Sequence, residues 1–179
     1  MAARDLRTVR TVFLDRDGTI NVKAAEGEYV TSPADLVLLP GAAKAVAALN
    51  AAGLRTVLVT NQRWLSGESA DPARFAATQQ RLERLLADEG ARLDAAYHCP
   101  HAAGTCDCRK PLAGMLIRAA QEHGFDLAES VMIGDSDADV RAGRAAGTMT
   151  VLLRAGGTDN TNADVVVEDL AAAVALILA

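Results

Sequence analysis

Two aspartates, Asp15 and Asp17, lie two residues apart in the run FLDRDGTIN, directly after a short apolar stretch. Carboxylates held this close raise each other's pKa unless a cation lies nearby. With Mg²⁺ bound, Asp15 can stay ionised and attack a phosphoryl group, while Asp17 can protonate the leaving oxygen and later activate water. A lone pair of this kind is more often a loop or a helix cap, so other residues must support the chemistry.

Three more polar groups follow apolar runs further along the chain, namely Thr60-Asn61, Arg109-Lys110 and Asp135. Mg²⁺ in proteins binds one or two carboxylates together with a substrate phosphate, and Asp135 is a natural further ligand. Thr60 and Lys110 are suited to neutralise the charge on the phosphoryl oxygens during transfer. The residue types therefore favour Mg²⁺-assisted phosphoryl transfer.

Asp135 lies in the run GDSDAD at 134–139, which has two other interpretations. The run could be an ordinary helix start, where acidic residues are stabilised by the helix dipole. It could also be a calcium-binding loop, but Val140 stands where the turn glycine of an EF-hand belongs. Ala146 stands where its closing glutamate belongs, so the calcium interpretation fails.

All three cysteines lie in the stretch HCPHAAGTCDCRKP at residues 98–111. Cys99, His101, Cys106 and Cys108 have the spacing C-x-H-x₄-C-x-C, and three thiolates with one imidazole complete a closed tetrahedral Zn²⁺ site. A closed site has no open position for water, so we expect a structural zinc that holds the loop carrying the Arg-Lys pair. The alternatives are a strained disulfide between two of the cysteines, a loop without metal, or His98 as the imidazole ligand.

Apolar runs alternate with helical patterns along the chain. We expect strands at 11–14, 55–59, 95–98, 130–133, 150–153 and 164–167, and helices at 40–52, 71–90, 112–123, 137–146 and 169–178. Strands without polar alternation, separated by helices of ten or more residues, predict a parallel sheet covered on both faces. Because ligands of such sheets bind beyond the carboxyl ends of the strands, the polar groups are expected to meet in one crevice.

Length and composition narrow the class of protein. The chain has 179 residues and a net charge of −5, which fits one domain over residues 1–179 and gives no basic excess for binding nucleic acid. The longest apolar stretch, 170–179, is too short to span a membrane, and no targeting segment is convincing. We therefore expect a cytoplasmic protein with reduced thiols, no membrane partner, and a monomeric state by default.

Four motifs together resemble those of the haloacid dehalogenase-like (HAD) phosphatases: DRDGT at 15–19, VTNQ at 59–62, RKP at 109–111 and GDSDAD at 134–139. The short spacing between them is similar to the branch without a large cap domain. The resemblance implies a Rossmann-like three-layer α/β fold with a mostly parallel sheet and a zinc loop at about 98–111. By motif, the resemblance implies that Asp15 is the nucleophile, that Asp17 is the general acid/base, and that Thr60 and Lys110 stabilise the phosphoryl group. It implies that substrate is bound by Asn61, Gln62, Arg63 and Arg109. It also implies that Mg²⁺ is held by Asp15, the Asp17 carbonyl and Asp135, with Asp139 supporting the site from behind.

The capless branch contains heptose bisphosphate phosphatases and histidinol-phosphate phosphatases. The run PLAGML after Lys110 resembles the first group, so we expect removal of the 7-phosphate of D-glycero-D-manno-heptose 1,7-bisphosphate. The short zinc loop is closer in length to the second group, and histidinol phosphate or another small phosphosugar remains the alternative substrate. A phosphotransferase and a non-catalytic phosphosugar-binding protein are the alternatives from other classes.

Three segments depart from the usual pattern of the family, and all of them face the substrate. They are the run 63–67, Ser136 where a lysine is common, and the longer stretch 23–28. Trp64, the single tryptophan, lies in the first of these. It is expected either to touch the substrate at the rim of the site or to anchor its loop.

Overall fold

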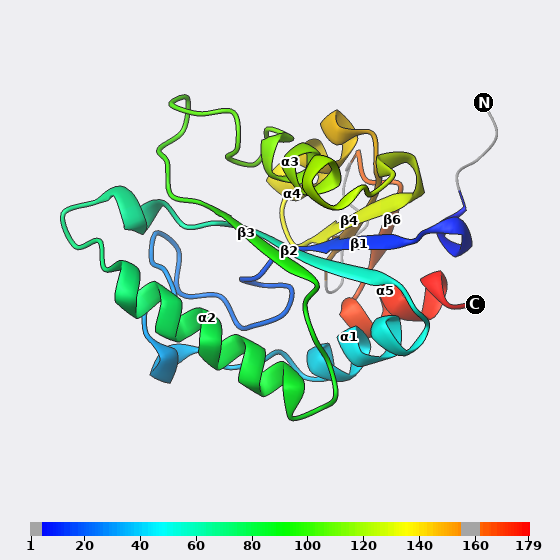
Figure 1. Ribbon diagram of the computed structural model, residues 1–179, viewed down its shortest axis with the longest axis horizontal. Coiled ribbons are helices and arrows are strands. Elements are labelled where there is room, and N and C mark those ends of the chain that lie inside the picture. Colours follow the sequence, from blue (N-terminus) through cyan, green and yellow to red (C-terminus); the bar gives the residue numbers. More distant parts are fainter. Residues whose placement is uncertain (1–4, 155–161) are drawn as a thin grey trace.

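A six-stranded sheet with the order β3-β2-β1-β4-β5-β6 forms the centre of the molecule (Figure 1). The computed structural model describes residues 5–154 and 162–179. Every neighbouring pair of strands runs parallel, which confirms the predicted sheet. The strands are β1 Thr11–Leu14, β2 Arg55–Asn61, β3 Ala95–Cys99, β4 Ser130–Gly134, β5 Met149–Leu153 and β6 Val165–Val167.

Helices cover both faces of the sheet and complete the three-layer fold. In Figure 1, α3 and α4 lie on one side, and α1, α2 and α5 lie on the other. The α-helices are α1 Ala42–Ala51, α2 Pro72–Ala87, α3 Gly114–His123, α4 Asp137–Ala146 and α5 Leu170–Ile177. Short 3-10 turns are η1 Leu6–Thr8, η2 Pro33–Asp35, η3 Arg63–Ser66 and η4 Leu127–Glu129.

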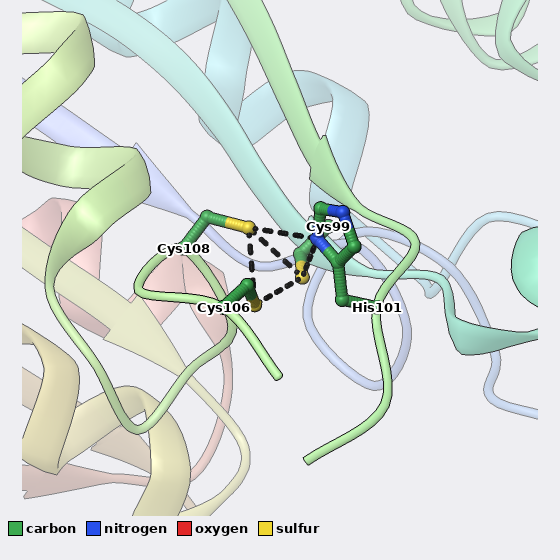
Figure 2. A group of neighbouring side chains, drawn as sticks. All are labelled: Cys99, His101, Cys106 and Cys108. Carbon is green, nitrogen blue, oxygen red and sulfur yellow. Dashed lines mark hydrogen bonds between the residues drawn. The ribbon is translucent and has the colours of Figure 1, made fainter. Parts of the chain in front are cut away.

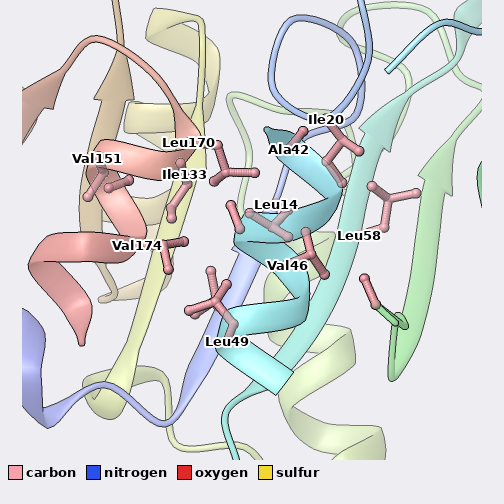
Figure 3. Close-up of a cluster of buried hydrophobic side chains, with 14 of the residues drawn as sticks. Leu14, Ile20, Ala42, Val46, Leu49, Leu58, Ile133, Val151, Leu170 and Val174 are labelled. Atoms are coloured by element: carbon pink, nitrogen blue, oxygen red, sulfur yellow. The ribbon is translucent and has the colours of Figure 1, made fainter. Parts of the chain in front are cut away.

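Alternate side chains of each central strand enter two separate apolar clusters. In β1, Leu14 packs with Val46 and Leu49 of α1, as Figure 3 shows, whereas Phe13 packs with Met115 and other residues on the opposite face. Both faces of the strand are therefore excluded from solvent. This explains why the strand has no polar alternation in the sequence.

The element boundaries differ from the predicted ones by up to three residues. Asp71 caps α2 as expected, because its carboxylate accepts a hydrogen bond from the Arg74 amide. The helix expected from residue 40 begins only at Ala42, since Gly41 has a positive φ of 76°. Among the described residues, no helix has the length and apolar character needed to cross a bilayer.

The chain between β1 and α1 folds back over the carboxyl end of the sheet. Two short extended segments are joined there by a hydrogen bond from the Val22 amide to the Val37 carbonyl (2.8 Å) and one from the Leu39 amide to the Ile20 carbonyl (2.9 Å). Residues 23–30 form the loop that projects from these segments along the site. The described residues contain no separate cap domain, as the short motif spacing predicted.

Candidate active site and metal centre

The carboxyl ends of four strands place their polar side chains in one cavity of about 600 Å³. Asp15 follows β1, Asp135 follows β4, and Lys110 comes from the loop after β3. This convergence is what the strand order and the parallel direction require. The polar residues that line the cavity are Asp15, Asp17, Lys23, Glu26, Glu28, Tyr29, Thr60, Asn61, Lys110, Asp135, Ser136 and Asp139.

Lys110 is the central cation of the site. Its Nζ lies 2.7 Å from Asp15 Oδ1 and 2.6 Å from Asp139 Oδ1, and it donates to the Val59 carbonyl at 2.8 Å. Burial works against the charge on this lysine, but the carboxylates of Asp139 and Asp15 outweigh it and raise the pKa of Lys110 to about 12. The ammonium group is therefore charged at any physiological pH.

The Asp15 carboxyl is almost fully buried, with 8% of the residue exposed. Burial, together with the negative charges of Asp139 and Asp17, raises its pKa to about 7, although Lys110 opposes the shift. A cation bound beside Asp15 would favour the ionised form, because an opposite charge within a few ångströms lowers a carboxyl pKa. The site thus has an excess of buried negative charge that suits a divalent cation.

Oxygen atoms of Asp15, Asp135 and Asp139 lie within 4.8 Å of one another and could hold such a cation. Two glycines make room for these side chains. A Cβ atom on Gly18, which has a φ of +86°, would lie 2.3 Å from Asp135 Oδ2, and one on Gly134 would lie 2.3 Å from the carboxyl carbon of Asp139. The carboxylate and carbonyl donors are those that Mg²⁺ prefers.

Asp139 was expected only to support the metal site from behind. The structure brings its carboxylate into the same group as Asp15 and Asp135, and against Lys110. The first turn of α4 explains this position, since Asp139 Oδ2 accepts the Ser136 amide at 3.1 Å in a capping box. Its other oxygen then points at the lysine.

The Asp17 carboxylate is held apart from that group by donors on three side chains. Arg16, which is fully buried, donates to both carboxylate oxygens at 3.1–3.2 Å. Asn21 donates to Oδ1 at 2.9 Å and Gln62 donates to Oδ2 at 3.0 Å. The carboxylate is therefore fixed in orientation at the edge of the cavity, as a proton-transfer group requires.

The four residues expected to bind substrate lie in different places. Asn61 lines the cavity and exchanges two hydrogen bonds with the Lys110 backbone, at 3.0 and 3.1 Å. Gln62 is fully buried behind Asp17 and does not line the cavity. Arg109 is half-buried and donates to the His101 carbonyl at 3.3 Å, and Arg63 is exposed on η3.

Lys23 was not singled out from the sequence as a site residue. Its Nζ lies 2.6 Å from Asp135 Oδ2, and this contact raises the pKa of Lys23. The departure of the stretch 23–28 from the family pattern was the one sign in the sequence that Lys23 could belong to the site. The local sequence did not indicate that this stretch would fold over the cavity. Because Ser136 occupies the position where the family often has a lysine, the cation in contact with Asp135 is Lys23.

Cys99, His101, Cys106 and Cys108 converge at the end of β3 (Figure 2). Five contacts among the three sulfur atoms and His101 Nδ1 measure 3.1–3.6 Å. A tetrahedral zinc ion with Zn–S bonds of about 2.3 Å places its sulfur ligands about 3.8 Å apart, so the four atoms fit such an ion after a slight expansion. All three cysteines are free, and His98 instead packs against Phe75, with the ring centroids 4.5 Å apart and the ring planes tilted by 49°.

The thiols of this cluster influence one another strongly. Burial and the neighbouring sulfur atoms raise the pKa of Cys108 to about 12. Burial also works against the thiolate of Cys106, but hydrogen bonds from the Arg109 amide and from the thiols of Cys108 and Cys99 outweigh it and lower the pKa of Cys106 to about 7. A metal ion would stabilise all three thiolates together, because thiolate is the ligand form.

Comparisons with known proteins point to one family of phosphatases. A HAD-hydrolase-like family model matches residues 107–173. The D-glycero-beta-D-manno-heptose-1,7-bisphosphate 7-phosphatase of Vibrio cholerae is 40% identical over 154 residues, which cover 81% of each chain. The D-glycero-D-manno-heptose-1,7-bisphosphate 7-phosphatase of Thermosynechococcus vestitus is 39% identical over 184 residues, covering 91% of this chain and 92% of that protein.

A solved structure shows the same fold. The D,D-heptose 1,7-bisphosphate phosphatase of B. bronchiseptica, in complex with magnesium and phosphate, superposes with a TM-score of 0.84 at 35% identity. The match covers 95% of this chain and 98% of that one. The six-stranded sheet and the arrangement around it are therefore those of a known phosphatase family.

Proposed function

Because the chain belongs to the family of D-glycero-D-manno-heptose-1,7-bisphosphate 7-phosphatases, we propose that it removes the 7-phosphate from D-glycero-D-manno-heptose 1,7-bisphosphate. The observation that carries this proposal is the convergence of Asp15, Thr60, Lys110 and Asp135 on one cavity. The names of these relatives favour the heptose substrate over histidinol phosphate.

Asp15 is the nucleophile in this proposal. Its carboxylate attacks the phosphorus, an aspartyl-phosphate forms, and the bond from phosphorus to the sugar oxygen breaks. Asp17 gives a proton to the departing oxygen. It then takes a proton from a water molecule that attacks the aspartyl-phosphate, which releases inorganic phosphate and restores the Asp15 carboxylate.

Lys110 and Thr60 stabilise the charge on the transferring phosphoryl group. Lys110 Nζ is within 2.7 Å of the attacking carboxylate, so it is already close to the oxygens that gain charge. Asn61 holds the lysine backbone, and we propose that Arg109 and Arg63 bind the rest of the substrate. We propose that Gln62 acts by holding Asp17 rather than by touching the sugar.

We propose Mg²⁺ as the catalytic cofactor. Asp15, Asp135 and the Asp17 carbonyl would hold it, with Asp139 beside them, and the bound ion would supply neutralising charge to the phosphoryl oxygens. The support is the cluster of three carboxylates within 4.8 Å, together with the space that two glycines leave for it.

We propose Zn²⁺ at Cys99, His101, Cys106 and Cys108, in a structural role. All four protein ligands are present, so no position is left for a reactive water. Zinc would fix the loop that ends in Arg109-Lys110. A reducing compartment such as the cytoplasm would keep these thiols available for metal.

The proposal is tested by a phosphate-release panel with purified protein and Mg²⁺. The substrates are both anomers of the heptose 1,7-bisphosphate, histidinol phosphate and common sugar phosphates. We expect the heptose bisphosphate to be hydrolysed with the highest kcat/KM, Mg²⁺ dependence, and no turnover by Asp15→Asn. A higher kcat/KM for histidinol phosphate would overturn the substrate, and wild-type turnover by Asp15→Asn would overturn the nucleophile.

The same panel separates the remaining classes. Phosphate release in buffer without an added acceptor argues against an obligate phosphotransferase. Turnover itself excludes a protein that only binds phosphosugars. Asp137→Asn is a suitable control variant, because Asp137 starts the same helix as Asp139 but has a side chain that is 67% exposed.

A further inference from the structure

The indole of Trp64 faces inward from η3 and does not line the cavity. The residue is 8% exposed, and its Nε1–H donates to Gln62 Oε1 at 2.8 Å. The ring packs edge-on against Phe75 of α2, with the centroids 6.4 Å apart. Of the two expectations for Trp64, contact with substrate at the rim is not what the structure shows.

The hydrogen bond from Trp64 decides which way the Gln62 amide faces. An indole nitrogen can only donate, so the amide oxygen must turn toward it and the amide NH₂ must turn away. The NH₂ group then meets Asp17 Oδ2 at 3.0 Å and Thr60 Oγ1 at 2.9 Å. With the opposite orientation, the amide oxygen would face the Asp17 carboxylate and repel it.

Both the side chain and the backbone of Gln62 are held in place by hydrogen bonds. It is fully buried, and both its amide oxygen and its two amide hydrogens have partners. Its backbone is fixed as well, since its N–H donates to the Cys99 carbonyl at 2.7 Å and its carbonyl accepts from the Leu65 amide at 3.1 Å. Buried polar groups that are completely satisfied hold one arrangement strongly.

We infer that Trp64 is a positioning residue for the phosphatase reaction, acting through Gln62 to orient the Asp17 carboxylate. This inference rests on the proposed role of Asp17 as the acid that protonates the leaving oxygen. Trp64 touches no substrate in this account. Its effect should therefore appear only when the leaving oxygen needs a proton.

The test compares two substrates that differ in this need. An alkyl phosphate, such as the heptose bisphosphate, must have its leaving oxygen protonated, whereas p-nitrophenyl phosphate releases a phenolate that is stable without a proton. The measured quantity is kcat/KM, because it reports the steps up to transfer of the phosphoryl group to Asp15. Any loss that passes through the Thr60 hydroxyl lowers both values equally, so the ratio of the two losses reports Asp17.

Trp64→Phe keeps an aromatic ring against Phe75 and removes only the N–H donor. We expect roughly a tenfold loss of kcat/KM with the alkyl phosphate and less than about a twofold loss with p-nitrophenyl phosphate, as the removal of one hydrogen bond suggests. Phe75→Leu is the matched control, since it disturbs the packing and keeps the donor. It should lower both values by the same small factor.

A double-mutant cycle tests whether Trp64 acts on Asp17 through Gln62. Gln62→Met removes the amide and should give a similar selective loss, and adding Trp64→Phe to it should cost little more, because both changes interrupt one chain of contacts. Equal losses with the two substrates, or fully additive effects of the two changes, would overturn the inference. If Trp64→Phe does not fold, equal losses of kcat/KM for Gln62→Met with the two substrates would still overturn the inference, because Trp64 acts only through Gln62.

Failure of the proposed function gives a different result. If the wild-type protein does not hydrolyse the heptose bisphosphate but does hydrolyse another alkyl phosphate in the panel, the substrate is wrong. That alkyl phosphate then replaces it in the comparison. Selective loss on that substrate would still support the role of Trp64.

Discussion

Asp15→Asn should stabilise the protein in the absence of Mg²⁺ while it abolishes turnover. The reason is the buried carboxyl: burial and the charges of Asp139 and Asp17 raise its pKa from 3.8 to about 7 in the folded state. Between those two values, the unfolded chain has lost this proton and the folded chain still holds it. Stability therefore falls as the pH rises from about 4 to about 7, and the loss is complete above the folded pKa.

The size of the effect follows from the shift. A difference of about three pKa units corresponds to about 4 kcal/mol, which is an upper limit for a group coupled to Lys110 and two carboxylates. Asparagine has almost the same shape and no charge, so we expect a gain of about 2 to 4 kcal/mol at pH 8.5 and almost none near pH 4. For a chain of this length, such a gain raises Tm by roughly 4 to 16 °C.

Thermal unfolding followed by circular dichroism, from pH 5 to pH 8.5, measures this difference. The protein is dialysed into Mg²⁺-free buffer without a chelator, so that a metal ion proposed at the cysteine cluster is not removed. Asp137→Asn is the control and should show no pH-dependent gain. A gain for Asp15→Asn that is the same at every pH, or a loss of stability at pH 8.5, would refute the reasoning, and saturating Mg²⁺ should shrink the gain because it binds the wild-type carboxylate.

Three further perturbations address the metals and the shape of the site. Cys106→Ser should lower zinc content and reduce kcat/KM for the bisphosphate by roughly 10- to 100-fold without removing the nucleophile; full turnover by protein shown to be free of zinc would contradict the structural role. Lys23→Met should tighten Mg²⁺ binding measured by calorimetry, because Lys23 no longer competes for Asp135; weaker binding would show that the lysine instead supports the site. Gly134→Ala should unfold at least about 2 kcal/mol more easily in urea, since its Cβ would overlap Asp139; unchanged stability would show that this side chain moves freely.

The sequence predicted well which residues of the site lie at the carboxyl ends of the strands. Apolar runs located the strands, and a parallel sheet has all its carboxyl ends at one edge, so Asp15, Thr60 and Asp135 had to be neighbours. Lys110 joined them because its loop follows the adjacent strand β3. These positions depend only on the order and direction of the strands, which the local hydrophobic pattern of the sequence predicts.

Side-chain directions were harder to predict, because they depend on contacts between distant segments. Asp139 turned toward Lys110 through a capping box that the sequence suggested only as a helix start. Lys23 reaches Asp135 across 112 positions of the chain, and no local pattern encodes that contact. Trp64 was ambiguous for the same reason, since a 3-10 turn of four residues decides which way its ring points.

The structure also changes how the zinc loop should be understood. The sequence suggested that the metal is the main factor that positions Lys110. The lysine is in fact held by Asn61 through two backbone hydrogen bonds, by the Val59 carbonyl, and by two carboxylates. Loss of zinc should therefore weaken this placement in part. The residue most dependent on the metal should be Arg109, because its guanidinium donates to the His101 carbonyl within the cluster itself. Zinc loss should accordingly raise KM for a large bisphosphate more than it lowers kcat for a small phosphate ester.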